Sequence, residues 1–255
     1  MKKQFLFIAV MISAILFSCS KERIETPPVS ASSENDMISN ATVQHELSIN
    51  TLNIDLVGEY QFDGNLKDAT GKLDVAYPNF SRAKVLYTND RKGQPNKAIY
   101  FNAKYGLDVY DVPSTPTGCS FSFWMKCDTI PTTIWLTLLN GSRGFGVQQY
   151  QNTFFGYFWN TVSNPMGQGV TTSPLNTFFW HHIVGTRDNS VMKLYIDGVL
   201  IGTSPTPAVS GPYPSLGNYN VGSYGSATYW KGSMDDLRFY KRVLSAAEVS
   251  QLYNL

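Results

Sequence analysis

The sequence predicts an all-β domain in which two antiparallel sheets pack face to face. Aromatic residues make up 14% of the 255 residues and glycine occurs 20 times, a mixture of strand and turn formers that favours β structure. Residues 191–196 alternate between two faces, as a half-buried strand does. The pair Asp197-Gly198 follows and tolerates the positive φ angles of a tight hairpin turn. Residues 199–201 are therefore expected to return as the partner strand.

Residues 1–18 are typical of a targeting segment. A basic start precedes an apolar run from Phe5 to Phe17, which has the length of a signal-peptide core and is too short to cross a bilayer as a helix. Residues 16–19, Leu-Phe-Ser-Cys, resemble a bacterial lipobox, which implies cleavage before Cys19 and lipidation of that residue. The alternative is an ordinary signal peptide with an incidental cysteine. Because no aspartate follows Cys19 directly, the resemblance implies a lipid-anchored protein of the bacterial outer membrane or cell surface.

Residues 19–50 are expected to form a flexible tether. They include Thr26-Pro27-Pro28 and a Ser/Ala run from Ser30 to Ser33, with few aromatic residues. Such a segment cannot bury enough apolar surface to order itself. The folded domain is therefore predicted to span residues 51–255, a length that suits a single β-sandwich.

The first half of this domain shows strands separated by turns. Residues 56–62 alternate and end at the turn Asp63-Gly64-Asn65, and residues 98–101 and 107–109 are expected to form two further strands. In the strand predicted over 120–126, three apolar side chains share one face and Trp124 lies on the other. This pattern is typical of a strand within a sandwich.

The chain closes with a short helix. Ser245 with Glu248 has the spacing of a capping box. The apolar residues that follow have helical spacing: Val249, Leu252 and Tyr253.

Motifs in this order resemble the LamG-like, concanavalin A-like jelly rolls. The matching segments are Y-Q-F-D-G-N-L-K-D-A-T-G at 60–71, S-F-W at 122–124, W-H-H-I-V-G-T-R-D with K-L-Y-I-D-G at 180–198, and M-D-D-L-R-F-Y at 234–240. The resemblance covers residues 56–255 and implies the jelly-roll fold. It does not settle the activity, because the fold is used by lectins, adhesion modules and glycosidases.

The same resemblance implies a structural Ca²⁺ ion that joins the first and last strands. Oxygen ligands on turns suit calcium, and the predicted ligands are Asp63, Asn65, Asp68 and Asp235. The alternative is that these are turn residues whose side chains bond their own backbone. Asp236 is expected to pair with Arg238 instead.

Residues for catalysis are missing from the sequence. Glycosidases use two carboxyl groups across the scissile bond, but Glu248 is the only glutamate after residue 59, and the capping box accounts for it. His181 and His182 are adjacent on a strand and point to opposite faces, so packing roles are expected. No nucleophile elbow occurs, and we do not expect an enzyme.

Cys119 and Cys127 lie eight positions apart in one predicted strand. At ~3.3 Å per residue they would be ~26 Å apart, far beyond the reach of a disulfide. Both are expected to be free and apolar.

A sugar-binding surface is the remaining candidate site. Aromatic rings stack on sugar faces, and the candidate rings lie in Gly-, Asn- and Ser-rich surroundings: Trp135, Tyr157, Trp159, Tyr219, Tyr224 and Trp230. The alternative is that most of them fill the core. The net charge of +1 comes without a basic stripe, which disfavours nucleic-acid binding.

The sequence therefore predicts a non-catalytic cell-envelope lipoprotein that binds extracellular carbohydrate or a glycosylated surface. A surface adhesion or scaffold protein that recognises protein partners is the first alternative. A divergent glycoside hydrolase is the second.

Overall fold

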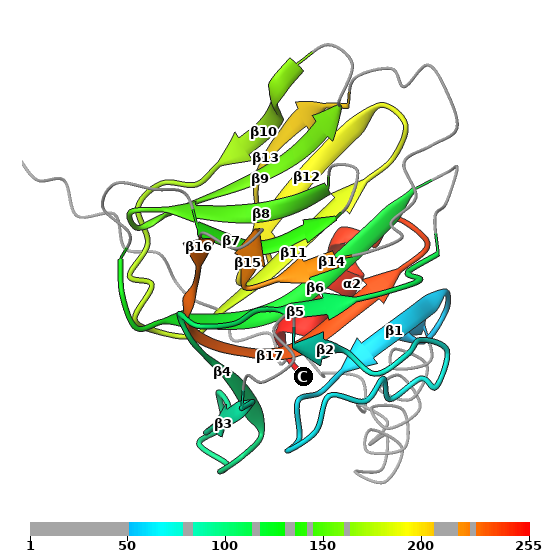
Figure 1. Cartoon of the computed structure of the whole chain (residues 1–255). Coiled ribbons are helices and arrows are strands. Elements are labelled where there is room, and N and C mark those ends of the chain that lie inside the picture. Colours follow the sequence, from blue (N-terminus) through cyan, green and yellow to red (C-terminus); the bar gives the residue numbers. More distant parts are fainter. Residues whose placement is uncertain are drawn as a thin grey trace, which may run out of the picture. The chain divides into compact units, whose positions relative to one another are not determined.

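The structure, a computed structural model, describes residues 51–78, 84–113, 118–130, 136–141, 145–160, 164–206, 219–224 and 228–255. Within these ranges the strands form two large antiparallel sheets and a separate two-stranded hairpin, and one C-terminal helix follows them in the chain (Figure 1). The predicted all-β, two-sheet antiparallel sandwich with a short C-terminal helix is confirmed.

The first sheet has eight strands among the described residues, and β17 lies near its centre. In order, they are β13 (Val199–Pro205), β12 (Val191–Ile196), β11 (His181–Arg187), β6 (Cys119–Cys127), β17 (Lys231–Tyr240), β4 (Ala98–Asn102) and β3 (Leu86–Thr88), with β1 (Leu56–Tyr60) also paired to β17.

The second sheet has seven described strands. In order, they are β10 (Asn164–Thr171), β9 (Thr153–Asn160), β8 (Phe145–Tyr150), β7 (Leu136–Gly141), β14 (Tyr219–Val221), β5 (Leu107–Val109) and β2 (Tyr77–Pro78). The small hairpin pairs β15 (Ser223–Tyr224) with β16 (Thr228–Tyr229).

The main hydrophobic core lies between the two sheets. Phe121, Phe123 and Met125 of β6 share the face that enters it, as their alternation predicts, and each is at most 1% exposed. Leu139 and Val147 of the seven-stranded sheet belong to the same buried cluster. Side chains from both sheets therefore interdigitate, as in other aligned sandwiches.

A second apolar cluster lies between the eight-stranded sheet and the helix α2 (Ala246–Tyr253). Val249 and Leu252 of α2 are buried in it. The predicted capping box is present: Ser245 Oγ accepts from the Glu248 backbone, and Glu248 Oε2 accepts from the Ser245 N–H at 2.8 Å. On the same side of the sheet, the ring of Trp124 stacks on Tyr253 with centroids 5.6 Å apart.

The hairpin between β12 and β13 forms as predicted. Its two turn residues both adopt positive φ, 51° at Asp197 and 79° at Gly198. The bonds across β12 and β13 pair Ile196 with Val199, which is the register of a two-residue turn.

A bulge divides β17 into two halves with different neighbours. Residues Lys231–Met234 pair with β4, and Leu237–Tyr240 pair with β1. The pairing with β6 shifts register between Asp235 and Arg238. The acidic pair at the start of this shift therefore lies where β4 stops and β1 begins as a partner.

Cys119 and Cys127 are free and buried, as their spacing predicts. Cys19 lies outside the described residues, so its predicted lipidation remains a prediction. Among the described helices, none is both long and apolar enough to span a membrane.

Candidate functional site

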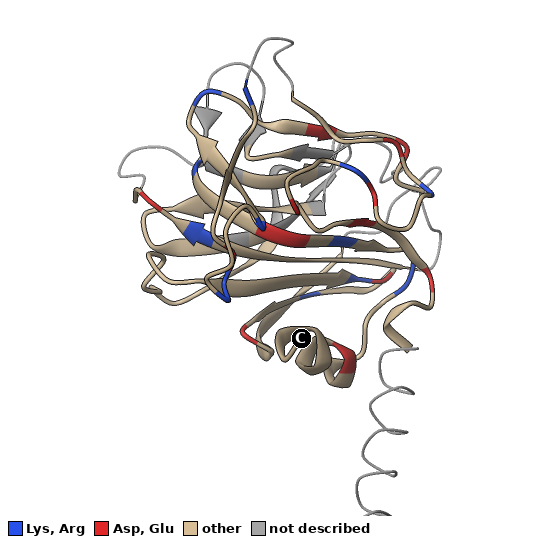
Figure 2. Ribbon diagram, turned by 90° about the horizontal axis from the view of Figure 1, so that it is seen from below, with Lys and Arg blue, Asp and Glu red and all other residues tan. Residues whose placement is uncertain are grey.

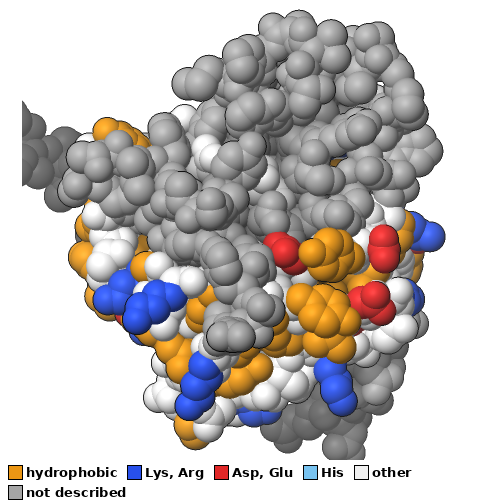
Figure 3. Space-filling view, in the orientation of Figure 1, with side chains coloured by type: hydrophobic (Ala, Val, Ile, Leu, Met, Phe, Trp, Pro, Cys, Tyr) orange, Lys and Arg blue, Asp and Glu red, His pale blue; other side chains and the backbone are white. Residues whose placement is uncertain are grey.

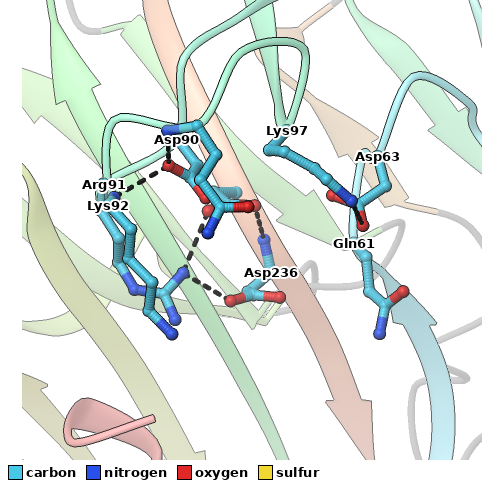
Figure 4. A pocket seen from close by; sticks show the side chains of 9 residues that line it. Gln61, Asp63, Asp90, Arg91, Lys92, Lys97 and Asp236 are labelled. Atoms are coloured by element: carbon cyan, nitrogen blue, oxygen red, sulfur yellow. Dashed lines mark hydrogen bonds and ion pairs between the residues drawn. The ribbon is translucent and has the colours of Figure 1, made fainter.

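A polar pocket brings together two of the residues predicted for calcium. Asp63 follows β1 and Asp235 lies in β17, and both line a pocket of about 180 Å³ (Figure 4). The loop between β3 and β4 supplies most of the other side chains. The remaining lining residues are Gln61, Asp90, Arg91, Lys92, Gln94, Lys97 and Asp236.

Three of the four carboxylates of this pocket are bonded to basic side chains of the same loop. Arg91 Nη1 donates to Asp235 Oδ2 at 3.0 Å and to Asp236 Oδ2 at 2.6 Å. Lys97 Nζ donates to Asp63 Oδ2 at 2.5 Å, and the close-up shows the two side chains meeting (Figure 4). Burial, followed by the neighbouring charge of Asp236, raises the pKa of Asp235 to about 7.

Asn65 and Asp68, the other two predicted ligands, serve the turn instead. Asn65 Nδ2 donates to the carbonyl of Asp63, and its Oδ1 accepts from the backbone of Lys67, both at 2.9 Å. The Asp68 carboxylate accepts from four backbone N–H groups, those of Glu59, Thr70, Lys72 and Leu73. Burial opposes ionisation of Asp68, but hydrogen bonds from Thr70 and these backbone groups outweigh it and lower its pKa.

The described residues do not fit the predicted calcium site. Ca²⁺ takes about six to eight oxygen ligands, and no group of three or more His, Cys, Asp or Glu side chains that could hold a metal ion occurs in the described part of the chain. Asp63 and Asp235 share a pocket as predicted, but a lysine and an arginine occupy their carboxylates. The arrangement gives no support to a structural calcium ion.

The two histidines have packing roles, as their positions on one strand predict. His182 is 0% exposed, and its Nε2 lies 2.8 Å from Ser122 Oγ. Its ring lies 5.0 Å from that of Trp124. His181 is half-buried and pairs with Asp197 at 2.7 Å. Because the Ser122 hydroxyl is also 0% exposed, this serine–histidine pair is not open to a substrate.

Four of the described carboxylates are held in ion pairs with arginine side chains. Glu59 pairs with Arg238 at 2.8 Å, and Glu248 pairs with Arg242 at 2.7 Å. Asp235 and Asp236 share the Arg91 guanidinium.

Trp230 is wrongly predicted as a sugar-contacting ring. It is 0% exposed, and its Nε1 donates to Gln149 Oε1 at 3.1 Å inside the core. Its ring also lies 5.7 Å from that of Phe101. The surrounding Gly- and Tyr-rich sequence suggested a loop, but the residue directly precedes β17 and packs inward.

The side chains of the other five predicted sugar-contacting rings are not described. Trp135 lies outside the described residues. The backbone of four others is described but their side chains are not: Tyr157, Trp159, Tyr219 and Tyr224. Their backbone positions are in β9, β14 and β15.

One cross-strand row crosses the seven-stranded sheet from edge to edge. Consecutive pairings link one residue of each strand: Gly169, Tyr157, Gly146, Asn140, Asn220, Asp108 and Tyr77. Directly paired residues of antiparallel strands share a face of the sheet. The neighbouring positions Leu107, Val109 and Leu139 are buried in the core, so Asp108 and Asn140 lie on the opposite, outer face of the sheet. Asn140, in the middle of the row, is only 8% exposed.

The row combines aromatic, amide, carboxylate and glycine positions, and ends in a tyrosine pair that the sequence did not indicate. Tyr77 and Tyr110 are 50% and 39% exposed, with ring centroids 6.4 Å apart. Tyr110 Oη donates to Asp108 Oδ2 at 3.2 Å. The only sequence signal for these rings is a tyrosine at the edge of a short predicted strand, which is too general to mark a site.

Charges of both signs are mixed over the described surface. Lys and Arg alternate with Asp and Glu along the ribbon, and the space-filling view shows hydrophobic side chains between them (Figures 2 and 3). In these views no stripe of one sign follows the described strands.

A comparison with protein families gives a match over residues 102–250, to the family described as the concanavalin A-like lectin/glucanases superfamily. The matched region covers more than half of the chain. The chain belongs to this family. A comparison with curated proteins gave no match.

Solved structures with the same fold include several binding domains. Domain 4 of AbnA, a GH43 extracellular arabinanase from Geobacillus stearothermophilus solved with arabinotriose, has a TM-score of 0.60 and 22% identity, over 78% of this chain and 98% of that one. A botulinum neurotoxin type C structure, from work on its interaction with two ganglioside molecules, has a TM-score of 0.66 and 14% identity, over 81% of this chain and 52% of that one. The binding domain of Paraclostridial mosquitocidal protein 1 has a TM-score of 0.61 and 18% identity, over 78% of this chain and 52% of that one. This concanavalin A-like chain thus spans about half the length of the two toxin chains, and at these identities the likeness concerns the fold.

Proposed function

We propose that this concanavalin A-like domain binds extracellular carbohydrate without catalysis. The observation that carries the proposal is the cross-strand row on the outer face of the seven-stranded sheet. Its exposed end joins two tyrosine rings to a carboxylate, the combination that stacks on a sugar face and bonds its hydroxyls. The arabinotriose complex of domain 4 of the arabinanase supports the choice of ligand class.

The shape of the row favours an extended oligosaccharide. Six interstrand spacings of ~4.8 Å give the row a length of ~29 Å, enough for several sugar units in line. Glycines occupy the positions on both sides of Tyr157, so no neighbouring side chain flanks that position in the row. Asn140 is only 8% exposed, whereas Tyr77 is 50% exposed, so we place the first contact of a linear glycan at the tyrosine end of the row.

The cellular setting belongs to the same proposal. We infer a lipoprotein cleaved before Cys19, acylated at that residue, and displayed at the outer membrane or cell surface. Several acyl chains would hold the protein stably, whereas one would bind only reversibly. The tether at 19–50 would hold the domain away from the bilayer, within reach of a glycosylated surface.

A protein-binding scaffold remains the second candidate, and one observation favours it. Three consecutive apolar side chains of β13 are exposed: Val199 by 64%, Leu200 by 46% and Ile201 by 39%. β13 ends the eight-stranded sheet among the described strands, and exposed apolar patches at sheet edges are frequent protein interaction sites.

A glycan array distinguishes the two candidates. The full chain, purified in detergent, is probed on linear and sialylated oligosaccharides, first with calcium and then with a chelator. Binding to a defined glycan class, unchanged by the chelator, is expected. Absence of binding under both conditions would contradict carbohydrate recognition and direct the search to protein partners.

A further inference from the structure

Arg91 holds two consecutive carboxylates of the last strand with one guanidinium group. Its Nη1 lies 3.0 Å from Asp235 Oδ2 and 2.6 Å from Asp236 Oδ2. The three side chains are 11%, 4% and 16% exposed, respectively. Ion pairs this well shielded from water are coupled more strongly than surface pairs.

The β17 bulge allows two adjacent residues to reach the same cation. Consecutive residues of a regular strand point to opposite faces, but Asp236 has φ 48° and the register with β6 shifts at this point. The Asp236 N–H donates to Asp235 Oδ1 at 2.9 Å. A non-glycine residue at positive φ costs free energy. At Asp236 this conformation allows both carboxylates to bind Arg91.

The loop that carries Arg91 is also attached to the helix side of the sheet. The Arg91 guanidinium lies 4.7 Å from the ring centroid of Trp124, within the range of a cation–π contact. Trp124 stacks on Tyr253 of α2, and Lys92 Nζ donates to the Leu255 carbonyl oxygen at 2.6 Å. The loop thus connects the β17 bulge to the C-terminal helix.

A second basic side chain of the loop pairs with another carboxylate of the pocket. Lys97, from the end of the same loop, bonds Asp63 beyond β1. The four carboxylates that line the pocket are accompanied by three basic side chains of this one loop. Asp63 and Asp235, the two predicted calcium ligands of the pocket, thus each have one carboxylate oxygen bonded to a basic side chain of the protein.

We propose that Arg91, assisted by Lys97, is the built-in cation of this pocket and joins the first and last strands without a metal ion. The protein is then independent of calcium, and its carboxylates become a divalent-cation site only when the arginine is removed. This inference does not depend on carbohydrate binding.

Thermal unfolding of the full chain in detergent tests the proposal. The wild type is expected to unfold at the same temperature with 5 mM CaCl₂ as with EDTA. Arg91→Ala leaves two shielded carboxylates without their cation, so its Tm should fall by ~5 °C or more, and calcium should restore part of that loss. Isothermal titration with CaCl₂ should show heat of binding for Arg91→Ala and none for the wild type.

Two further variants keep the test decisive. If Arg91→Ala does not fold, Arg91→Lys replaces it in the test. This variant keeps the positive charge but loses the planar guanidinium that bonds both carboxylates, so its Tm should fall by less than that expected for Arg91→Ala. Arg91→Ala combined with Asp235→Asn and Asp236→Asn should lose the calcium response. The proposal is overturned if calcium stabilises the wild type, if titration with CaCl₂ shows binding to the wild type, or if Arg91→Ala unfolds like the wild type and ignores calcium.

Discussion

Tyr110 donates its hydroxyl hydrogen to Asp108 at 3.2 Å on the outer face of the seven-stranded sheet. The Asp108 carboxylate, and to a lesser extent burial, raises the pKa of Tyr110, so the phenol remains a donor at neutral pH. Both residues lie beside Tyr77, whose ring is half exposed. This arrangement fixes the orientation of the tyrosine pair in the proposed glycan site.

Tyr110→Phe should therefore weaken glycan binding while keeping the fold. The substitution removes the hydroxyl that orients the ring and leaves the stacking surface in place. We expect a loss of about three- to tenfold in affinity, the size of one hydrogen bond. Titration calorimetry with the best array ligand measures it, and an affinity equal to the wild type would remove Asp108 and Tyr110 from the site.

His182 should make the protein sensitive to acid. Burial, and next the charge of Arg238, lowers the pKa of His182 to about 3 from its ordinary 6.5. The unfolded chain takes up this proton below pH ~6.5 but the folded chain does not. The contribution of His182 to stability is thus complete above pH ~6.5 and is lost at ~1.4 kcal/mol per pH unit as the pH falls toward 3.

Urea unfolding at pH 7, 5.5 and 4 measures this dependence. His182→Gln should be less stable at pH 7 but lose less stability on acidification than the wild type. Parallel losses in the two proteins would show that another group causes the acid sensitivity. His181→Gln is the control, because the hydrogen bond to Asp197 raises the pKa of His181 and gives it the opposite dependence on pH.

Gly232→Ala should destabilise the sandwich more than Gly71→Ala. A Cβ at Gly232 would overlap the Lys126 carbonyl oxygen and the ring of Trp230, so the backbone of β17 or β6 would have to move. We expect a loss of ~3 kcal/mol, the upper range for overpacking. Gly71 has φ 68° and open space around it, so its alanine variant should lose only ~1 kcal/mol of backbone strain. Equal free energies of unfolding would contradict the close approach at Gly232.

Cys19→Ser should release the protein from membranes. If Cys19 carries the acyl chains, the variant loses its anchor and cannot be labelled with a radioactive fatty acid. Membrane fractionation and labelling in the producing bacterium measure both effects. Labelling of the serine variant to the level of the wild type would place the anchor elsewhere.

Local patterns predicted much of the fold. The Asp197-Gly198 turn, the alternation in β6 and the Ser245–Glu248 capping box each depend on neighbours within a few residues, and each appears as predicted. The pairing of Asp236 with Arg238 also appears, at 3.5 Å.

The candidate site depends on distant contacts that local patterns do not reveal. Arg91 is 144 positions from Asp235 and lies in a loop without a motif, so its ion pairs could not be foreseen. Tyr77 and Tyr110 form a pair only because β2 and β5 are neighbours at the end of the sheet. Trp230 was mistaken for a surface ring because composition does not distinguish a loop from the start of a buried strand.

The glycan site on the outer face of the seven-stranded sheet is tested most directly by two affinities for the best array glycan. One is that of the full chain, and the other is that of its double variant Tyr77→Ala/Tyr110→Ala. Stacking of a nucleobase on an aromatic side chain is worth ~1–3 kcal/mol. If a sugar face gains as much from each tyrosine, the double variant should bind at least about thirtyfold more weakly. Phe179→Ala, which removes a ring that is 66% exposed in the loop before β11, should bind like the wild type. Equal affinity of the double variant and the wild type would contradict a glycan site on the outer face of the seven-stranded sheet.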